Sequence, residues 1–463
     1  MVERALKNII LIDAHTQCID EILRYKNIII QVLIVTTEEQ RQRYINKQQI
    51  KSIYIHSETS NFSGTTNLTY DIIEQMKDTQ IKIENCLDRF ILDYQIKKKI
   101  YYTALDFWIG IFNTKKIDAI IINGVNHGMP YDGIPYGLGI KNGIPVYTIE
   151  VIMVGKRAVC NQILNKFLKF DESNNKINLQ SSKNYTMTYD LTTSKQWNNA
   201  GGIKKGIASI IYKFFGFLGL EFIDDILKGD FRSRTEGENG ITYDYFNKLT
   251  SYRKMKKVQR HLKKLEYPFE LGEKFIFYAL HFEPEGGILA RVSMESHWTL
   301  IKMIQENLPD GWYLYVKEHP HQFKLNNWTM EYFINNIEYF KSKTFYDQIN
   351  KLDRVKLIDS SVSGQVLLKN AEAVATMNGT IALEATDFNK PVLLFADNTT
   401  PLRECKDYFK IRCNADCSKA IESIKNGVRP DYDDLNDIMD TYVVNEDEIG
   451  YKKMVEAILQ DMT

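Results

Sequence analysis

Short, continuously apolar segments alternate with longer helical patterns along the first 150 residues, and this alternation restricts the fold more than any other feature of the chain. The apolar segments are rich in Ile and Val and lie at 8–12, 28–35, 50–55, 117–122 and 144–149. A helical pattern runs over 71–112. Strands without polar alternation are typical of a parallel sheet that helices cover on both faces. We therefore predict an N-terminal α/β domain.

The same alternation returns in the second half, with apolar segments at 275–280, 312–316, 355–358, 373–376 and 392–395 and predicted helices at 296–306 and 380–387. A length of 463 residues accommodates two such halves. We predict an α/β fold with two domains that face each other across a cleft. Their predicted limits are 1–265 and 266–440, and 441–463 is expected to form a helix that packs back on the first domain. Ligands of open parallel sheets bind beyond the carboxyl ends of the strands, so the loops after the strands are the predicted sites of chemistry.

Charge and cysteine content exclude several classes of protein. Lys plus Arg and Asp plus Glu both number 59, so net charge does not favour a nucleic-acid partner, and we predict none. Six scattered Cys residues are too few for a disulfide framework and favour a reducing compartment. The most apolar window, 208–223, contains Lys213 and Glu221 and is too short for a spanning helix. We predict a cytoplasmic protein.

A basic, amphipathic insertion is predicted near 200–264. Lysines lie beside aromatic residues in 201–227, and seven basic side chains without an acid lie in 253–264. Such segments can lie on an anionic membrane surface, which predicts peripheral contact with the inner membrane. Two alternatives are a solvated helix face with a core helix between the domains, and an intramolecular contact with the acidic stretch 431–448.

The first candidate site comes directly after the apolar segment 312–316 and reads Lys317-Glu318-His319-Pro320-His321. An imidazole at the end of a strand, followed by a rigid proline, can donate to a phosphate oxygen or transfer a proton. Lys317 adds positive charge. The alternative is that His319 only ends a loop. A metal site is not predicted, because no third ligand accompanies the two histidines at a recognisable spacing.

The second candidate site is Asn378-Gly379-Thr380, where a strand ends and a helix begins. The amide end of a helix favours an anion, and a glycine lets the backbone approach it closely. Thr380 supplies a hydroxyl group, and Glu384 lies one turn further along the same face. The alternative is a simple helix cap.

Two further loops carry ionisable groups at predicted strand ends. His281, Glu283 and Glu285 come after 275–280, and His127 and Asp132 come after 117–122. We regard them as candidate acids, bases or nucleophiles, with polar surface turns as the alternative. The sequence lacks the glycine–lysine phosphate loop of common nucleotidases and a complete dinucleotide fingerprint, and we predict no cofactor.

Three segments together resemble bacterial capsule polysaccharide glycosyltransferases: Ala279–Glu285, Gly311–Pro320 and Asn378–Ala385, with Lys390-Pro391-Val392 shortly after the third. The similarity covers 275–396 and extends weakly to Asn126-His127-Gly128 and Asp132. Within that group, the segments are similar to those of Kdo transferases and related enzymes that use CMP-activated ulosonic acids. The resemblance implies a GT-B fold, in which two Rossmann-like domains bind the acceptor on the N-terminal side and the donor nucleotide on the C-terminal side.

The resemblance also implies roles for individual residues. His319 and Thr380 would hold the donor phosphate, and Glu384 would contact the nucleotide or sugar. Such enzymes need no catalytic metal, because histidine and helix-end donors stabilise the leaving group. All candidate residues fall into two sets by role. The donor-binding set is His281, Lys317, His319, Pro320, Asn378, Gly379, Thr380 and Glu384, and the candidate catalytic set is Asp132, His127, Glu285 and His319.

The predicted function is transfer of an acidic sugar, such as Kdo, pseudaminic acid or a related nonulosonic acid, from a CMP-activated donor to a saccharide or lipid-linked acceptor. The sequence leaves three alternatives open: a UDP-sugar-dependent GT-B hexosyltransferase, a sugar-nucleotide epimerase, and a non-catalytic subunit of a capsule assembly complex. The sequence does not decide which of Asp132, Glu283 and Glu285 is the base or nucleophile.

Overall fold

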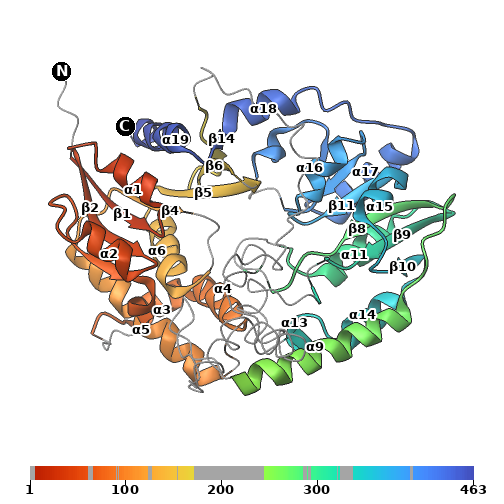
Figure 1. The fold of residues 1–463 in the computed structure, drawn as a ribbon, viewed down its shortest axis with the longest axis horizontal. Helices are drawn as coiled ribbons and strands as arrows, with labels where there is room; N and C mark the ends of the chain where they lie inside the picture. The colour runs from red at the N-terminus through yellow and green to blue at the C-terminus, as the bar shows by residue number, and fades with distance from the viewer. Residues whose placement is uncertain are drawn as a thin grey trace, which may run out of the picture. The chain divides into compact units, whose positions relative to one another are not determined.

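The computed structural model describes residues 6–60, 66–89, 91, 93–123, 128–153, 155–170, 245–284, 289, 294–320, 322–323, 337–396 and 400–462 (Figure 1). The chain divides into two compact units, one formed by 1–177, 286–295 and 375–463 and the other by 178–285 and 296–374. The predicted segment 201–227 lies outside the described residues. The domain limits predicted from the sequence stay a prediction.

The first sheet has a Rossmann-like parallel part. Its strand order is β14-β6-β5-β4-β1-β2-β3, with β7 paired to β6. The strands β5, β4, β1, β2 and β3 are parallel, whereas β6 pairs antiparallel with β5, β7 and β14. The strands are β1 (Lys7–Ile12), β2 (Ile28–Val35), β3 (Ile53–Ile55), β4 (Ala119–Asn123), β5 (Val146–Met153), β6 (Lys156–Asn161), β7 (Lys166–Phe167) and β14 (Val444–Asn445).

Helices α1 and α19 pack together on the first sheet (Figure 1). Ile9 and Leu11 of β1 share one apolar cluster with Ile19 of α1 and with Met454 and Ile458 of α19, all nearly inaccessible to solvent. The helices that accompany this sheet are α1 (Thr16–Ile22), α2 (Glu38–Tyr44), η1 (His56–Ser60), α3 (Tyr70–Gln75), α4 (Lys77–Leu87), α5 (Tyr94–Thr114), α6 (Pro130–Lys141) and α19 (Glu448–Asp461). Helix α18 (Leu435–Tyr442) contacts η6 (Pro401–Glu404).

One helical prediction is corrected by the structure. The pattern over 71–112 forms three helices, α3, α4 and α5, instead of one. Met76, between α3 and α4, leaves the helical region with φ −98° and ψ 13°. α5 then begins anew at Asp93, whose side chain accepts a hydrogen bond from Ile96 N–H at 2.9 Å. Apolar periodicity continues across both breaks, so periodicity alone did not reveal them.

The second sheet has the strand order β10-β9-β8-β11-β12-β13, and its strands run parallel from β8 through β9 to β10 and from β12 to β13. This order matches the doubly wound arrangement of a Rossmann-like sheet. The strands are β8 (Lys274–Ala279), β9 (Trp312–Lys317), β10 (Val355–Leu357), β11 (Ala373–Thr376), β12 (Val392–Leu394) and β13 (Tyr408–Lys410). The prediction of an α/β fold with two Rossmann-like sheets is confirmed.

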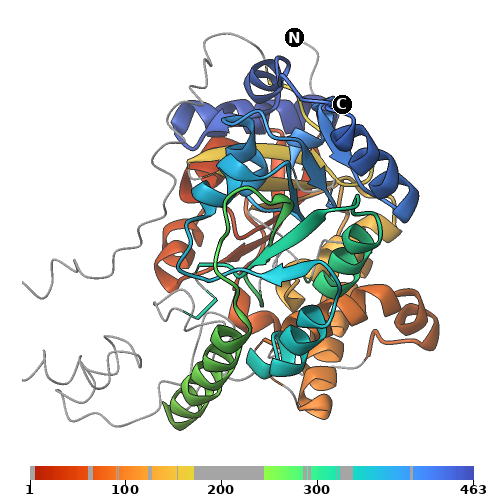
Figure 2. The same ribbon diagram turned by 90° about the vertical axis from the view of Figure 1, so that its right-hand side faces the viewer.

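The helices of the second half include the long basic helix α9, whose buried Met255, Val258 and Leu262 mark the face that packs against α13 and α14 (Figure 1 and Figure 2). Among the described residues, none of the helices has the length and apolar character needed to cross a bilayer. The helices of this half are α9 (Tyr245–Leu265), α11 (His297–Glu306), α13 (Ile337–Phe340), α14 (Lys343–Asn350), α15 (Gly364–Asn370), α16 (Ile381–Thr386), η6 (Pro401–Glu404) and α17 (Asn414–Lys425).

Replacing Ile458 with alanine should lower the free energy of unfolding by about 2–5 kcal/mol, because it opens a cavity beneath α19. The matched control is Ile449→Ala on the same helix. Ile449 is 66% exposed, so its loss should cost no more than about 0.5 kcal/mol. Urea unfolding followed by circular dichroism measures both values. Equal losses would contradict the packing of α19 on this sheet.

Candidate functional site

Strands β8 and β9 end side by side, and their registers bring two predicted loops to the same edge of the sheet. Ala279 pairs with Lys317, and Leu280 N–H donates to the Lys317 carbonyl at 2.9 Å. The loop that begins with His281 therefore starts beside the loop that begins with Glu318. In the strand order β8 also neighbours β11, which precedes Asn378. Between β8 and β11 the strand order reverses, and ligands of doubly wound sheets bind at such reversals.

A buried ionic cluster lies beneath the first two loops. The Lys341 side chain, between α13 and α14, has no exposed surface, and its Nζ donates to Glu318 Oε1 at 2.8 Å. The same Nζ lies 3.8 Å from Glu283 Oε2 and donates to the His281 carbonyl at 2.6 Å. The Tyr346 hydroxyl donates to Glu318 Oε2. Burying charged groups is costly unless they are paired, and here the lysine is paired with carboxylates from both loops.

His297, at the start of α11, supports the first loop as a neutral imidazole. Its Nε2 accepts a hydrogen bond from His281 N–H at 3.3 Å, so the ring proton is assigned to Nδ1, which lies 2.7 Å from the Tyr278 hydroxyl. Burial, together with the positive charge of Lys341 and the nearby His281, holds the pKa of His297 well below its usual value. The ring therefore stays uncharged at neutral pH.

A side-chain amide connects the two loops directly. Gln322 Oε1 accepts a hydrogen bond from Glu283 N–H at 2.9 Å, and Gln322 Nε2 donates to the Glu283 carbonyl at 2.7 Å. Gln322 is fully buried, so both of its bonds are shielded from water. The amide thus fixes the backbone of one loop against the other.

His281, Lys317 and His319 lie at this edge of the sheet: His281 comes just after β8, Lys317 ends β9, and His319 follows two residues later. His319 N–H donates to Glu318 Oε1 at 2.7 Å, and its half-buried ring lies 5.7 Å from the ring of Phe282, measured between centroids. Lys317 is buried, with Nζ 3.5 Å from the Glu318 carbonyl. Pro320 is exposed. Glu285 and His321 lie outside the described residues.

The loop after β11 is shaped by a close approach at Gly379. Gly379 N–H donates to Thr376 Oγ1 at 3.1 Å, and a Cβ atom at this position would lie 2.8 Å from the same oxygen. A side chain at 379 would therefore disturb the turn. Thr380 is exposed, and its side chain makes no capping hydrogen bond to α16. Asn378 and Glu384 are half-buried.

In the first unit, Asp132 is buried and lies in the first turn of α6. Its Oδ1 accepts a hydrogen bond from Met129 N–H at 2.8 Å, which ties the carboxylate to the start of the helix. Beside it, Arg89 Nη2 lies 3.3 Å from Met129 Sδ. His127 lies outside the described residues. A role of Asp132 or His127 in chemistry stays a prediction.

Sequence reasoning missed the supporting residues of the cluster. Glu318 and Gln322 lie inside or beside the His-Pro motif, but a carboxylate next to a lysine gives no sign that it faces inward. The sequence indicates His297 only as the start of a helix. Lys341 and Tyr346 come 23 and 28 positions after Glu318, and no spacing rule connects them to the strand ends.

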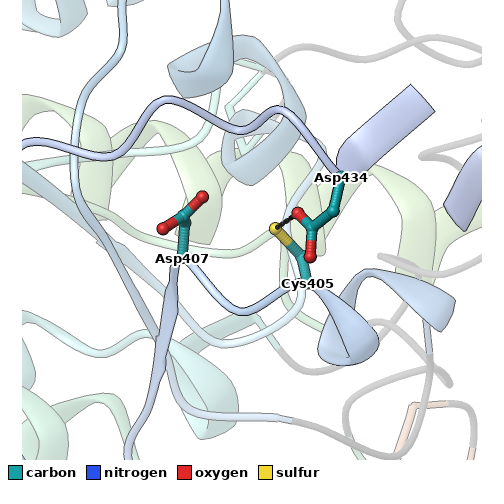
Figure 3. Close-up of side chains that lie close together, drawn as sticks. All are labelled: Cys405, Asp407 and Asp434. Atoms are coloured by element: carbon teal, nitrogen blue, oxygen red, sulfur yellow. Dashed lines mark hydrogen bonds between the residues drawn. The ribbon is translucent and has the colours of Figure 1, made fainter. Parts of the chain in front are cut away.

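Among the described residues, one group could hold a metal ion: Cys405, Asp407 and Asp434, whose ligand atoms lie within 4.8 Å of one another (Figure 3). Internal bonds already satisfy these groups. Cys405 Sγ donates to Asp434 Oδ1 at 3.1 Å, and Tyr432 N–H donates to Asp407 Oδ2 at 3.1 Å. Burial, with Asp434 nearby, raises the pKa of the Cys405 thiol to about 12, so the thiol is protonated. The cluster is therefore stable as a hydrogen-bonded group.

No protein-family model matches the sequence, and no curated protein matches it. Several solved structures are similar over nearly the whole chain. UDP-GlcNAc 2-epimerase from Methanocaldococcus jannaschii is 13% identical, with 98% of this chain and 100% of that chain covered and a TM-score of 0.27. KpsC, a beta Kdo 2,7 transferase from Thermosulfurimonas dismutans, is 10% identical, with 86% and 98% covered and a TM-score of 0.30.

UDP-GlcNAc 2-epimerase from Neisseria meningitidis bound to UDP-GlcNAc is 14% identical, with 98% of this chain and 100% of that chain covered and a TM-score of 0.24. Identities and TM-scores this low assign no activity to the chain.

His297→Gln should flatten the dependence of stability on pH. The folded protein keeps His297 neutral, whereas the unfolded chain binds a proton below its ordinary pKa of 6.5. Above that pH the neutral ring costs the folded protein no stability. Below it, the free energy of unfolding falls by up to about 1.4 kcal/mol for each pH unit, because only the unfolded chain takes up the proton. The control Tyr278→Phe removes the hydrogen bond between Tyr278 and His297 but leaves the imidazole in place, so stability should depend on pH as in the wild-type chain. Urea unfolding between pH 5 and 8 gives the slopes, and an unchanged slope in His297→Gln would contradict a neutral ring.

Proposed function

We propose that the chain is a glycosyltransferase of surface-polysaccharide biosynthesis that transfers an acidic sugar from a CMP-activated donor to a saccharide or lipid-linked acceptor. The observation that supports the proposal is the position of His281, Lys317 and His319 at or just after the paired ends of β8 and β9, in a sheet with the Rossmann-like strand order. The three segments that resemble capsule glycosyltransferases contain these residues and the loop after β11.

The proposed chemistry uses the chain's own donors. Departure of CMP from an acidic sugar places negative charge on the leaving phosphate, and fixed hydrogen-bond donors at that position lower the barrier. The His319 imidazole is the proposed donor, because its backbone is held by Glu318 and its ring is half-buried. The exposed Thr380 hydroxyl, on the loop after β11, is the proposed second donor, as the resemblance to capsule glycosyltransferases implies. Metal independence is part of this proposal.

The carboxylate that activates the acceptor is proposed to be Asp132 or Glu285. Glu283 fits this role less well, because its backbone is bonded to Gln322 and its carboxylate lies beside Lys341 and His297 inside the protein. A buried carboxylate that neighbours a lysine is suited to fixing a loop rather than to meeting a sugar hydroxyl.

Calorimetric titration with CMP, CDP and UDP tests the donor. CMP is expected to bind, and His319→Ala should lower turnover with a CMP-sugar by about 10²–10³-fold, the usual effect of removing one donor to a leaving group. His261→Ala is the matched control, since His261 lies on α9 and bonds to Asp347.

Unchanged turnover in His319→Ala would remove the central assignment. Tight UDP binding without CMP binding would favour a hexosyltransferase or an epimerase, and incubation of a UDP-sugar without acceptor separates those two, because only the epimerase forms a new sugar nucleotide. Failure to bind any nucleotide would favour the non-catalytic subunit.

We also propose that the chain contacts an anionic membrane surface through α9. Arg253, Lys257, Arg260 and Lys264 are exposed and recur at helical spacing, so they form one basic stripe. The apolar face of α9 is already packed against α13 and α14, so the contact is electrostatic and does not require insertion.

Flotation with vesicles tests this contact. The protein should float with phosphatidylglycerol vesicles, stay behind with phosphatidylcholine vesicles, and be released by salt. Changing the four stripe residues to glutamine should remove about 1 kcal/mol of binding for each charge. The control changes four scattered, exposed lysines to glutamine: Lys26, Lys47, Lys51 and Lys116. Equal effects of the two sets would contradict a specific stripe.

A further inference from the structure

We propose that Lys341 is a positioning residue that holds the loops of His281 and His319 in the arrangement that binds the donor. This inference rests on the proposed function, because the two loops carry the proposed donor-binding residues. Lys341 is not one of the site residues predicted from the sequence, and it lies apart from them along the chain.

One ammonium group connects three points on the two loops. Lys341 Nζ donates to the His281 carbonyl at 2.6 Å and to Glu318 Oε1 at 2.8 Å, and it lies 3.8 Å from Glu283 Oε2. His281 and Glu283 belong to the loop after β8, and Glu318 belongs to the loop after β9. The lysine therefore acts as a bridge between the ends of neighbouring strands.

The bridge reaches His319 through a shared oxygen. Glu318 Oε1 accepts hydrogen bonds from both Lys341 Nζ and His319 N–H, the second at 2.7 Å. The Tyr346 hydroxyl holds the other oxygen of Glu318, so the carboxylate has little freedom to turn. Any shift of Lys341 thus changes where the carboxylate lies and where the His319 backbone lies with it.

Because Lys341 is buried, it can affect a ligand only through the residues that it contacts. Its side chain has no exposed surface, and that of Glu318 is 3% exposed. An ammonium without access to solvent cannot contact a nucleotide, so its effect on binding has to pass through the loops. Removing the lysine also leaves two buried carboxylates without their cation, which destabilises a protein strongly. The test has to separate these two effects.

The experiment compares Lys341→Met, Glu318→Gln and the double variant Lys341→Met/Glu318→Gln with the wild-type chain. The double variant removes one carboxylate together with the lysine and is expected to regain much of the melting temperature that Lys341→Met loses. If Lys341 positions the loops, the double variant should still bind CMP about 10–100-fold more weakly, because the bond to the His281 carbonyl is missing. Lys351→Met, at the exposed end of α14, is the control and should bind CMP as the wild type does.

A second measurement does not depend on nucleotide binding. The ring signals of His281 and His319 in NMR spectra of histidine-labelled protein, assigned with His281→Gln and His319→Gln, should shift in the double variant and stay in place in Lys351→Met. A folded double variant with wild-type ring signals would overturn the positioning role. If the wild-type chain binds no nucleotide, the proposed function fails, whereas shifted ring signals would still support the positioning of the loops by Lys341.

Discussion

Burial of parallel strands on both faces is the constraint on which the rest of this structure depends. A parallel strand can meet its neighbour only through a crossover, and the crossover helices cover the sheet. β1 shows the result, because Ile10, Leu11 and Ile12 have no exposed surface. All strands of such a sheet end at the same edge. Polar loops that are far apart in the sequence, such as those after β8 and β9, are therefore collected at one place.

Where polar loops meet at one edge, some of their charged side chains become buried, which is costly unless they are paired. In the second sheet these side chains form a compact ionic cluster. Glu283 and Glu318 come from the two loops, Lys341 supplies the cation, and His297 remains neutral because it is buried and lies near the positive charge of Lys341. Lys341 thereby connects the loops after β8 and β9 through buried polar groups.

The strands were largely predictable, because a run such as Ile28–Val35 is apolar throughout most of its length and becomes a strand with the same limits. Ala373–Thr376 was predicted with the same limits as well. The break of the 71–112 pattern into three helices was not predictable from periodicity, which continues across both breaks. The positions of His281, Lys317 and His319 at or just after strand ends were predictable from the apolar runs that precede them, whereas their role in a site stays a prediction. Lys341 and Tyr346 were not predictable, because they lie near no strand end and match no spacing rule.

The sequence by itself determined the α/β class, the strands and the loops on which polar chemistry is concentrated, because these depend on local apolar runs and on the polar residues at their ends. Only the tertiary structure decided which side chains face inward. Glu283 and Glu318 look alike in the sequence as acids beside a strand end, yet both turn toward Lys341. The physical reason is that a buried charge needs a counter-charge, and the position of that partner is fixed by the packing of α13 and α14 rather than by any residue nearby in the chain.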